Sequence, residues 1–217
     1  VASLTAAGRY NEALPYAERA LAVADSNAAV RSRNNGAELS NLAQLIFWAG
    51  RYPEAEALAT RAVAALEVRY GSTTHHTIAD PLRILGDSLR AQNRTSRAIE
   101  VHQRARSIVE KPVGSNDADL ADILGSLGLD YLDAGRRDEA LALLNRALSL
   151  ATSSRRRLCL ARVKFALATA LGRQSKDAAQ ALVYAQGARA IFQERQMIDQ
   201  KREVDALLAQ LHTLLRD

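Results

Sequence analysis

The chain has 217 residues, of which 48% are hydrophobic and only 5% aromatic, and its formal net charge is +5. The apolar residues are mainly Ala and Leu, which favour helices over sheets. The single cysteine, Cys159, excludes an intrachain disulfide framework and favours a reducing, cytoplasmic compartment, and no apolar run reaches the ~20 residues of a membrane span.

The basic charge raises the question of a nucleic-acid ligand. The Arg residues are spread along the whole chain and are mixed with Asp and Glu. This distribution is typical of solvated helix faces, so we do not expect nucleic acid as a partner.

One short stretch recurs along the chain at a nearly constant interval. Its clearest form is Ala-Gly-Arg-Arg-Asp-Glu-Ala-Leu at residues 134–141, with close copies at 7–14 and 49–56 and a weaker copy at 92–99. Four columns keep a spacing of 42, 43 and 42 residues: Gly8, Gly50, Asn93 and Gly135; Ala13, Ala55, Ala98 and Ala140; Arg19, Arg61, Arg104 and Arg146; Ala20, Ala62, Ala105 and Ala147. Regular self-similarity of this length indicates a repeat architecture.

These columns have mechanical explanations. Gly or Asn suits the turn between two helices, where a positive φ is often required. The two Ala columns lie seven residues apart on one helix face, where a small side chain lets a neighbouring helix approach closely. The preceding segment of each repeat carries apolar residues at i, i+3, i+4 and i+7, as in Leu39, Leu42, Ala43 and Ile46, which predicts an amphipathic helix.

The combined pattern, Leu-x-x-Leu-(Ala/Gly) followed by Gly-x-Tyr-x-x-Ala and a second Ala, resembles the tetratricopeptide repeat. A period near 42 is similar to the kinesin-light-chain subfamily, and Gly114–Ala121 resembles the linker of that subfamily. The resemblance implies an all-α fold: a right-handed superhelical solenoid of antiparallel helix pairs. It also implies a scaffold that binds proteins.

The repeats predict one solenoid over residues 1–217. Its parts are a truncated repeat 1 (1–24), repeat 2 (36–70), repeat 3 (78–110), repeat 4 (118–151), a degenerate repeat 5 (155–195) and a C-terminal capping helix (197–215). We expect helices near 37–49, 53–70, 78–92, 95–110, 118–134, 137–151, 155–173, 178–194 and 197–215. Because the chain begins at Val1 and repeat 1 lacks most of its first helix, we also expect a fragment of a longer protein.

No catalytic, metal or cofactor site stands out. His75 and His76 lack Cys or carboxylate partners at ligand spacing, which favours an exposed loop over a metal site. His102 falls at a helix-packing position, and Cys159 is expected to be a buried small hydrophobe. The run 155–157 of three Arg residues is interpreted as solvated, with contact to an anion or an acidic partner as the alternative.

The resemblance places a ligand on the first helix of each repeat. The candidate groove residues are Ser40, Asn41, Gln44, Trp48, Arg83, Asp87, Arg90, Ser126, Leu129, Asp133, Arg162 and Thr169, with Asp80, Asp122, Phe165 and Arg173 at neighbouring groove positions. Asn41 matches the Asn with which this subfamily holds a peptide backbone, but its equivalents are Ile84 and Ser126. Trp48 suits either a groove anchor or helix-end packing, and Arg83, Asp87 and Arg90 are also spaced as intrahelical ion pairs.

The sequence therefore predicts a non-catalytic interaction scaffold with a protein or peptide partner, and self-association as a further option. The alternative is the accessory array of a larger bacterial signalling protein. In that case the active domain, a serine/threonine kinase or a transcriptional regulator, would lie outside this sequence.

Overall fold

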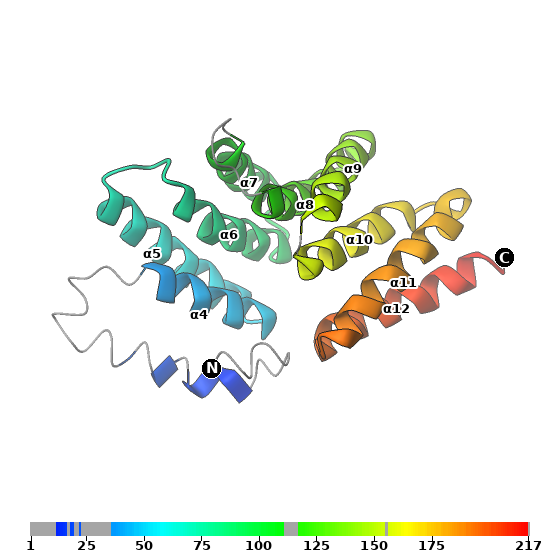
Figure 1. Cartoon of the computed structure of the whole chain (residues 1–217), viewed down its shortest axis with the longest axis horizontal. Coiled ribbons are helices and arrows are strands. Elements are labelled where there is room, and N and C mark those ends of the chain that lie inside the picture. Colours follow the sequence, from blue (N-terminus) through cyan, green and yellow to red (C-terminus); the bar gives the residue numbers. More distant parts are fainter. Residues whose placement is uncertain are drawn as a thin grey trace. The chain divides into compact units, whose positions relative to one another are not determined.

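The structure, a computed structural model, describes residues 12–16, 18, 19, 22, 36–110, 117–154 and 156–216. These residues form helices joined by turns, and none of them belongs to a strand (Figure 1). The elements are α4 (Gly36–Trp48), α5 (Tyr52–Tyr70), η1 (His76–Ile78), α6 (Ala79–Ala91), α7 (Thr95–Val109), α8 (Asp117–Asp133), α9 (Arg137–Ser153), α10 (Arg157–Leu171), η2 (Ser175–Asp177), α11 (Ala178–Glu194) and α12 (Ile198–Leu214).

The fold class is confirmed: the chain is an all-α solenoid of antiparallel helix pairs. The helices from α4 to α12 begin and end within about two residues of the predicted bounds. The predicted repeat 1 lies largely outside the described residues. The division of the chain into the stated repeats stays a prediction.

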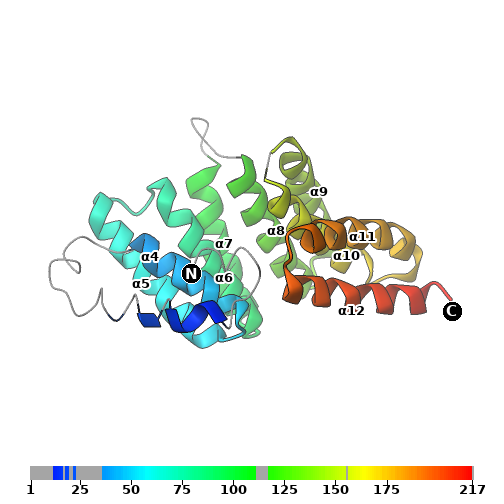
Figure 2. The same ribbon diagram turned by 60° about the horizontal axis from the view of Figure 1, so that its bottom comes forward.

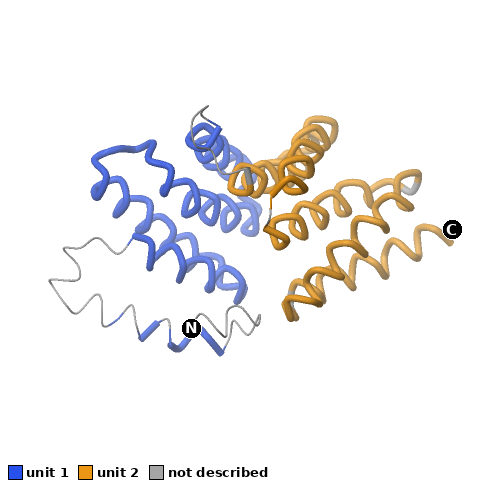
Figure 3. Tube along the Cα trace, in the orientation of Figure 1, with its two compact units in different colours: residues 1–5, 9–114 blue, residues 6–8, 115–217 orange. Residues whose placement is uncertain are grey.

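The chain forms two compact units, residues 1–5 with 9–114 and residues 6–8 with 115–217 (Figure 3). Unit 1 contains the pairs α4/α5 and α6/α7, and unit 2 contains α8/α9 and α10/α11. The closing helix α12 packs on α11 and runs alongside it (Figure 2).

Small residues bring the two helices of each pair close together. A Cβ added to Gly86 of α6 would lie 2.4 Å from the ring of His102 on α7, and one added to Gly128 of α8 would lie 2.7 Å from Leu144 Cγ on α9. His102 is fully buried, as predicted. The Ala columns of the second helices are fully buried as well: Ala55, Ala62, Ala98, Ala105, Ala140 and Ala147.

The turns within the pairs follow the sequence. Gly50, Asn93 and Gly135 have φ values of 78°, 60° and 77°, the left-handed conformation predicted for this column. The α10–α11 turn differs, because it is longer and contains η2. This difference explains why the spacing changes in the last repeat.

Within each unit the first helices lie closer together than the second helices. α4 packs against α6 and α8 packs against α10, whereas α5 and α7, like α9 and α11, make at most marginal contact. A stack of helix pairs is narrower on the side where neighbouring helices touch. The first helices therefore form the inner side of each unit.

In the described part of the chain, no helix is long and apolar enough to cross a membrane.

Candidate functional site

The predicted groove residues all lie on first helices, in two sets. The first-helix face of unit 1 carries those on α4 and α6: Ser40, Asn41, Gln44, Trp48, Arg83, Asp87 and Arg90. The first-helix face of unit 2 carries those on α8 and α10: Ser126, Leu129, Asp133, Arg162 and Thr169. Each face is described by itself.

Arg83 is the centre of the unit 1 face. Its Nη1 donates to Asp87 Oδ2 at 2.9 Å, and its Nη2 donates to Asp80 Oδ1 at 2.9 Å and to Gln44 Oε1. Ser40 Oγ donates to Asp80 Oδ2 at 3.2 Å. Gln44 and Ser40 belong to α4 and the other residues to α6, so this network joins the two first helices.

The network continues below the surface to the second helix. His102 Nε2 lies 3.1 Å from the backbone oxygen of Arg83, so Nε2–H is the donor, and it lies 3.6 Å from Asp87 Oδ1. The side chains of Arg83 and Asp87 are only 11% exposed, and that of His102 is fully buried. Buried polar groups are costly unless they are paired, and these are paired with one another.

This arrangement corrects two of the predicted groove residues. Ser40 is 5% exposed and Asp87 is 8% exposed, so neither offers its polar group to a ligand. The hydroxyl group of Ser40 bonds to Asp80. The carboxylate of Asp87 bonds to Arg83 and lies 3.6 Å from His102 Nε2. Arg83 makes the expected intrahelical pair with Asp87, but its bond to Gln44 also connects two repeats.

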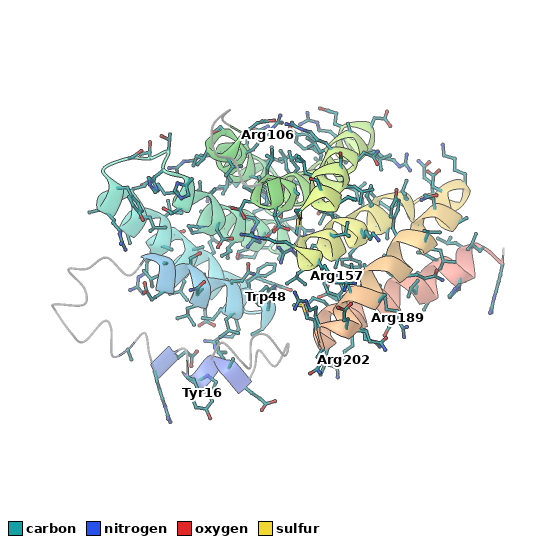
Figure 4. All side chains as sticks on the ribbon, viewed as in Figure 1. Tyr16, Trp48, Arg106, Arg157, Arg189 and Arg202 are labelled. Atoms are coloured by element: carbon teal, nitrogen blue, oxygen red, sulfur yellow. The ribbon has the colours of Figure 1, made fainter. Side chains whose placement is uncertain are left out.

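Two predicted residues of α4 remain accessible. Asn41 is exposed, and Trp48 is half-buried at the last position of the helix (Figure 4). Phe47 packs against Tyr52 across the following turn, with ring centroids 5.5 Å apart. Since Trp48 itself is half-buried, it is neither a core residue nor fully exposed to solvent.

On the unit 2 face, two Arg–Asp ion pairs join α8 to α10, and we call these two pairs the clamps. Arg162 binds Asp122 through two bonds, with Nε 3.0 Å from Oδ1 and Nη2 donating to Oδ2. Arg173 Nη2 donates to Asp133 Oδ1 at 2.9 Å and its Nη1 donates to the backbone oxygen of Leu132 at 3.1 Å. In both clamps the Arg side chain is more exposed than the Asp: 37% against 9%, and 49% against 32%.

An uncharged strip lies between the two clamps. Both clamps join residues 40 apart, so the same register places Gly125 opposite Phe165 and Leu129 opposite Thr169. Ser126, Leu129, Phe165 and Thr169 are half-buried. Gly125 itself is buried, but a Cβ added to it would have only Val163 Cγ2 within 4 Å, at 3.6 Å, so a methyl group fits there. We call these five residues, 125, 126, 129, 165 and 169, the uncharged strip.

The two described residues of the Arg run at the start of α10 are paired within the protein. Arg156 contacts Asp119 and Arg157 contacts Glu194, each at 2.6 Å, and Arg155 lies outside the described residues. All four side chains are at least 46% exposed, so these pairs contribute little to stability.

The other candidate residues have structural explanations. Cys159 is 1% exposed, its Sγ lies 3.5 Å from the backbone oxygen of Ala118, and burial raises the pKa of its thiol to about 12. His75 is half-buried rather than exposed, because its ring stacks on Tyr70 at 3.6 Å. No group of three or more potential metal ligands occurs among the described residues.

Sequence reasoning missed the bonds that cross between repeats. The signal for them is a separation near one repeat period between opposite partners, as in Asp122 and Arg162 or Asp133 and Arg173. The stacking of Tyr70 on His75 has no comparable signal in the sequence.

The family model described as Tetratricopeptide repeat matches residues 37–111 and 119–194, and a second model with the same description matches residues 1–24. No curated protein matches the sequence.

Several solved structures share the fold. The crystal structure of BtubC (BKLC) from P. vanneervenii is 18% identical over 95% of this chain and 88% of that chain, with a TM-score of 0.62. MamA is 19% identical over 89% and 94%, with a TM-score of 0.51. The putative kinesin light chain repeats from Podosopora anserina are 16% identical over 97% and 93%, with a TM-score of 0.52. At these identities the similarity concerns the fold alone.

Proposed function

Because the chain belongs to the tetratricopeptide repeat family, a helical scaffold that typically mediates protein interactions, we propose that it binds a peptide or protein segment on its first helices. The observation that carries this proposal is the uncharged strip of unit 2. It is partly accessible, lies on the inner side of the unit and is bounded by two charged clamps.

The clamps suit the strip to an extended segment. They fix α8 relative to α10, so little ordering is needed when a ligand binds. Apolar side chains of the ligand would pack on Leu129 and Phe165. Arg162 uses Nε and Nη2 for Asp122, which leaves its Nη1 to donate to a backbone carbonyl of the ligand.

Unit 1 contributes a second contact in this proposal. The exposed Asn41 can bond to a peptide backbone through its side-chain amide, and Trp48 offers a partly accessible aromatic surface. Ser40, Gln44, Asp80, Arg83 and Asp87 are engaged in the Arg83 network, and Arg90 is half-buried.

Selection of binders from a random peptide library with the full chain tests the proposal. The Leu129→Glu variant should lose the selected peptides, because a carboxylate would be buried against an apolar ligand. Ala142→Glu, on the exposed outer side of α9, is the matched control and should retain them. If the library yields no binder, or if both variants bind equally well, the proposal is wrong.

A second variant tests unit 1. Asn41 and Trp48 changed together to Ala should weaken peptide binding while helicity and the melting temperature stay nearly unchanged. A collapse of the melting temperature would show that Trp48 supports the core instead.

The alternative role is a regulatory array within a larger bacterial signalling protein. Repeat 5, with its longer turn, and the closing helix α12 support it, because they resemble the end of arrays that accompany kinase or regulator domains. A reading frame that encodes no catalytic or DNA-binding domain next to this segment would exclude it. The free, buried Cys159 supports a reducing, cytoplasmic location.

Self-association is a second kind of interaction that we propose. The outer side of α11 carries no exposed charged residue between positions 178 and 193. This surface lies on a second helix, apart from the first-helix face of unit 2.

A further inference from the structure

We infer that the segment bound by unit 2 is extended and uncharged, with two apolar side chains two positions apart and a hydrogen-bond acceptor two positions outside each of them. This inference rests on the proposed function and specifies the chemistry of its ligand. It follows from the spacing of the uncharged strip, from the donor groups beside it and from the pairing within the two clamps.

The uncharged strip offers apolar contact in two rows. Because α8 and α10 keep one register, the first row is Gly125 with Phe165 and the second row is Leu129 with Thr169. Four helical residues separate the rows, which corresponds to about 6 Å along the helix axis. In an extended segment, side chains two positions apart point to the same side and are about 6.6 Å apart. Two such side chains therefore fit the two rows, one on Phe165 and the other on Leu129.

The donor groups beside the strip favour an extended backbone over a helical one. Arg162 binds Asp122 through Nε and Nη2, which leaves Nη1 for a ligand, and the bonds of Arg173 use Nη1 and Nη2 but not Nε. The hydroxyl group of Ser126 makes no hydrogen bond to another described residue. A helical segment uses most of its carbonyl groups internally, whereas an extended segment offers them to such donors. The strip therefore selects against an amphipathic helix, whose apolar side chains would be three or four positions apart.

The clamps disfavour charge at both ends of the strip. Arg162 and Arg173 are the more exposed members of their pairs, so a Lys or Arg side chain of the ligand would meet a like charge. A carboxylate of the ligand would meet an Arg that an Asp already neutralises, and Asp122, at 9% exposed, is too buried to lose its partner without a large cost. An uncharged acceptor, such as the amide oxygen of Asn or Gln, costs less to bury and can accept from either Arg.

The clamps also lie where the outer positions of the segment would be. They are three helical residues before the first row and four after the second, which is about 4.5 Å and about 6 Å along the axis. The positions two beyond each apolar side chain are about 6.6 Å away, within reach of a long Arg side chain. The predicted ligand pattern is acceptor-x-apolar-x-apolar-x-acceptor, where x is any residue.

Selection from three peptide libraries tests the spacing. The libraries carry two Leu residues two, three or four positions apart, with polar residues, charged ones included, at random in all other positions. With the full chain, the library with a spacing of two should yield the tightest binders, and their outer positions should be enriched in Asn and Gln. These binders should be lost with Leu129→Glu and retained with Ala142→Glu.

The outcomes separate this inference from the proposed function. Binders that are as tight at a spacing of three or four would overturn the inference, while their loss with Leu129→Glu would leave the proposed function standing. If none of the libraries yields a binder, the proposed function and the inference both fail.

Charged variants of one selected peptide test the outer positions. Lys at both acceptor positions should weaken binding at least about tenfold, measured by fluorescence anisotropy, because the cations would face Arg162 and Arg173. Glu at these positions should weaken binding as well. The affinity of the uncharged peptide should change less than about twofold between about 0.05 M and about 0.5 M salt. Equal or tighter binding of the Lys or the Glu peptide would overturn the inference.

Discussion

The first-helix faces of the two units use the same repeat positions for opposite purposes. Arg83 and Asp87, the centre of the unit 1 network, correspond 42 residues later to Gly125 and Leu129 of the uncharged strip. In unit 1 these positions hold a buried charge network that joins α4 to α6. In unit 2 the charges have moved to the ends of the face, where more exposed Arg side chains join α8 to α10. In both units side-chain bonds connect the neighbouring first helices, and the location of these bonds decides whether the middle of the face is open to a ligand.

The largest expected effect is the loss of the unit 1 network. Arg83→Met leaves Asp87 largely buried without its cation, which should cost about 3–5 kcal/mol of unfolding free energy. Trp48 is the one Trp of the chain and lies in unit 1, so its fluorescence follows the unfolding of that unit in denaturant. Arg97→Met, on the exposed side of α7, is the control and should change stability by less than about 0.5 kcal/mol.

Cys159 provides the matching measurement for unit 2. Its thiol is buried and its raised pKa, about 12, keeps it protonated at neutral and mildly alkaline pH while unit 2 is folded. Alkylation should therefore be slow in the folded protein and should accelerate when unit 2 opens. Arg83→Met should lower the stability of unit 1, seen from Trp48 fluorescence, more than that of unit 2, seen from Cys159 alkylation. If it lowers the stability of both units equally, the network is not specific to unit 1.

The next largest effect is expected when the charged pair of unit 1 is introduced at the equivalent positions of unit 2. The double variant Gly125→Arg, Leu129→Asp installs an i, i+4 ion pair across the uncharged strip. It should weaken the binding of a selected peptide at least about tenfold, measured by fluorescence anisotropy, because the apolar contact is replaced by charge. Because Gly125 is buried, the single variant Leu129→Asp, at a half-buried position, is the control for stability, and its melting temperature should stay nearly unchanged. Undiminished peptide binding would mean that the ligand does not use the strip.

Most of the fold could be predicted from the sequence because its signals are local. The turn column identified Gly50, Asn93 and Gly135, all of which have positive φ, and the apolar stripes located the helices. Each of these features depends on residues within about two turns of each other, and its recurrence every 42 or 43 residues makes it recognisable.

The site was harder to predict because its bonds join different repeats. Arg83 has Asp80, Asp87 and Gln44 within reach at once, and a repeat pattern does not show which of them it binds. The burial of Asp87 depends on His102, which fills the space above Gly86. Groove positions inferred by resemblance therefore do not show which side chains are already engaged within the protein.

A smaller effect of opposite sign is expected at Gly125. This glycine lies within a helix, where Gly is less favourable than Ala, and a Cβ would make only an ordinary contact with Val163. Gly125→Ala should therefore stabilise unit 2 by roughly 0.5–1 kcal/mol, seen as slower alkylation of Cys159 in denaturant. Gly86→Ala, which would collide with the His102 ring, is the contrast and should destabilise unit 1. Equal effects at the two glycines would contradict the difference described between the faces.

The smallest effect is expected at the exposed clamp of unit 2. Arg173 and Asp133 are 49% and 32% exposed, and ion pairs in such settings contribute about 0–1 kcal/mol. A double-mutant cycle of Arg173→Ala and Asp133→Ala should give a coupling energy in that range, and added salt should reduce it further. A coupling of about 2 kcal/mol or more would mean that the clamp is as structural as the Arg83 network. A weak coupling has a functional consequence, because Arg173 could then exchange Asp133 for an acceptor on a bound segment at little cost.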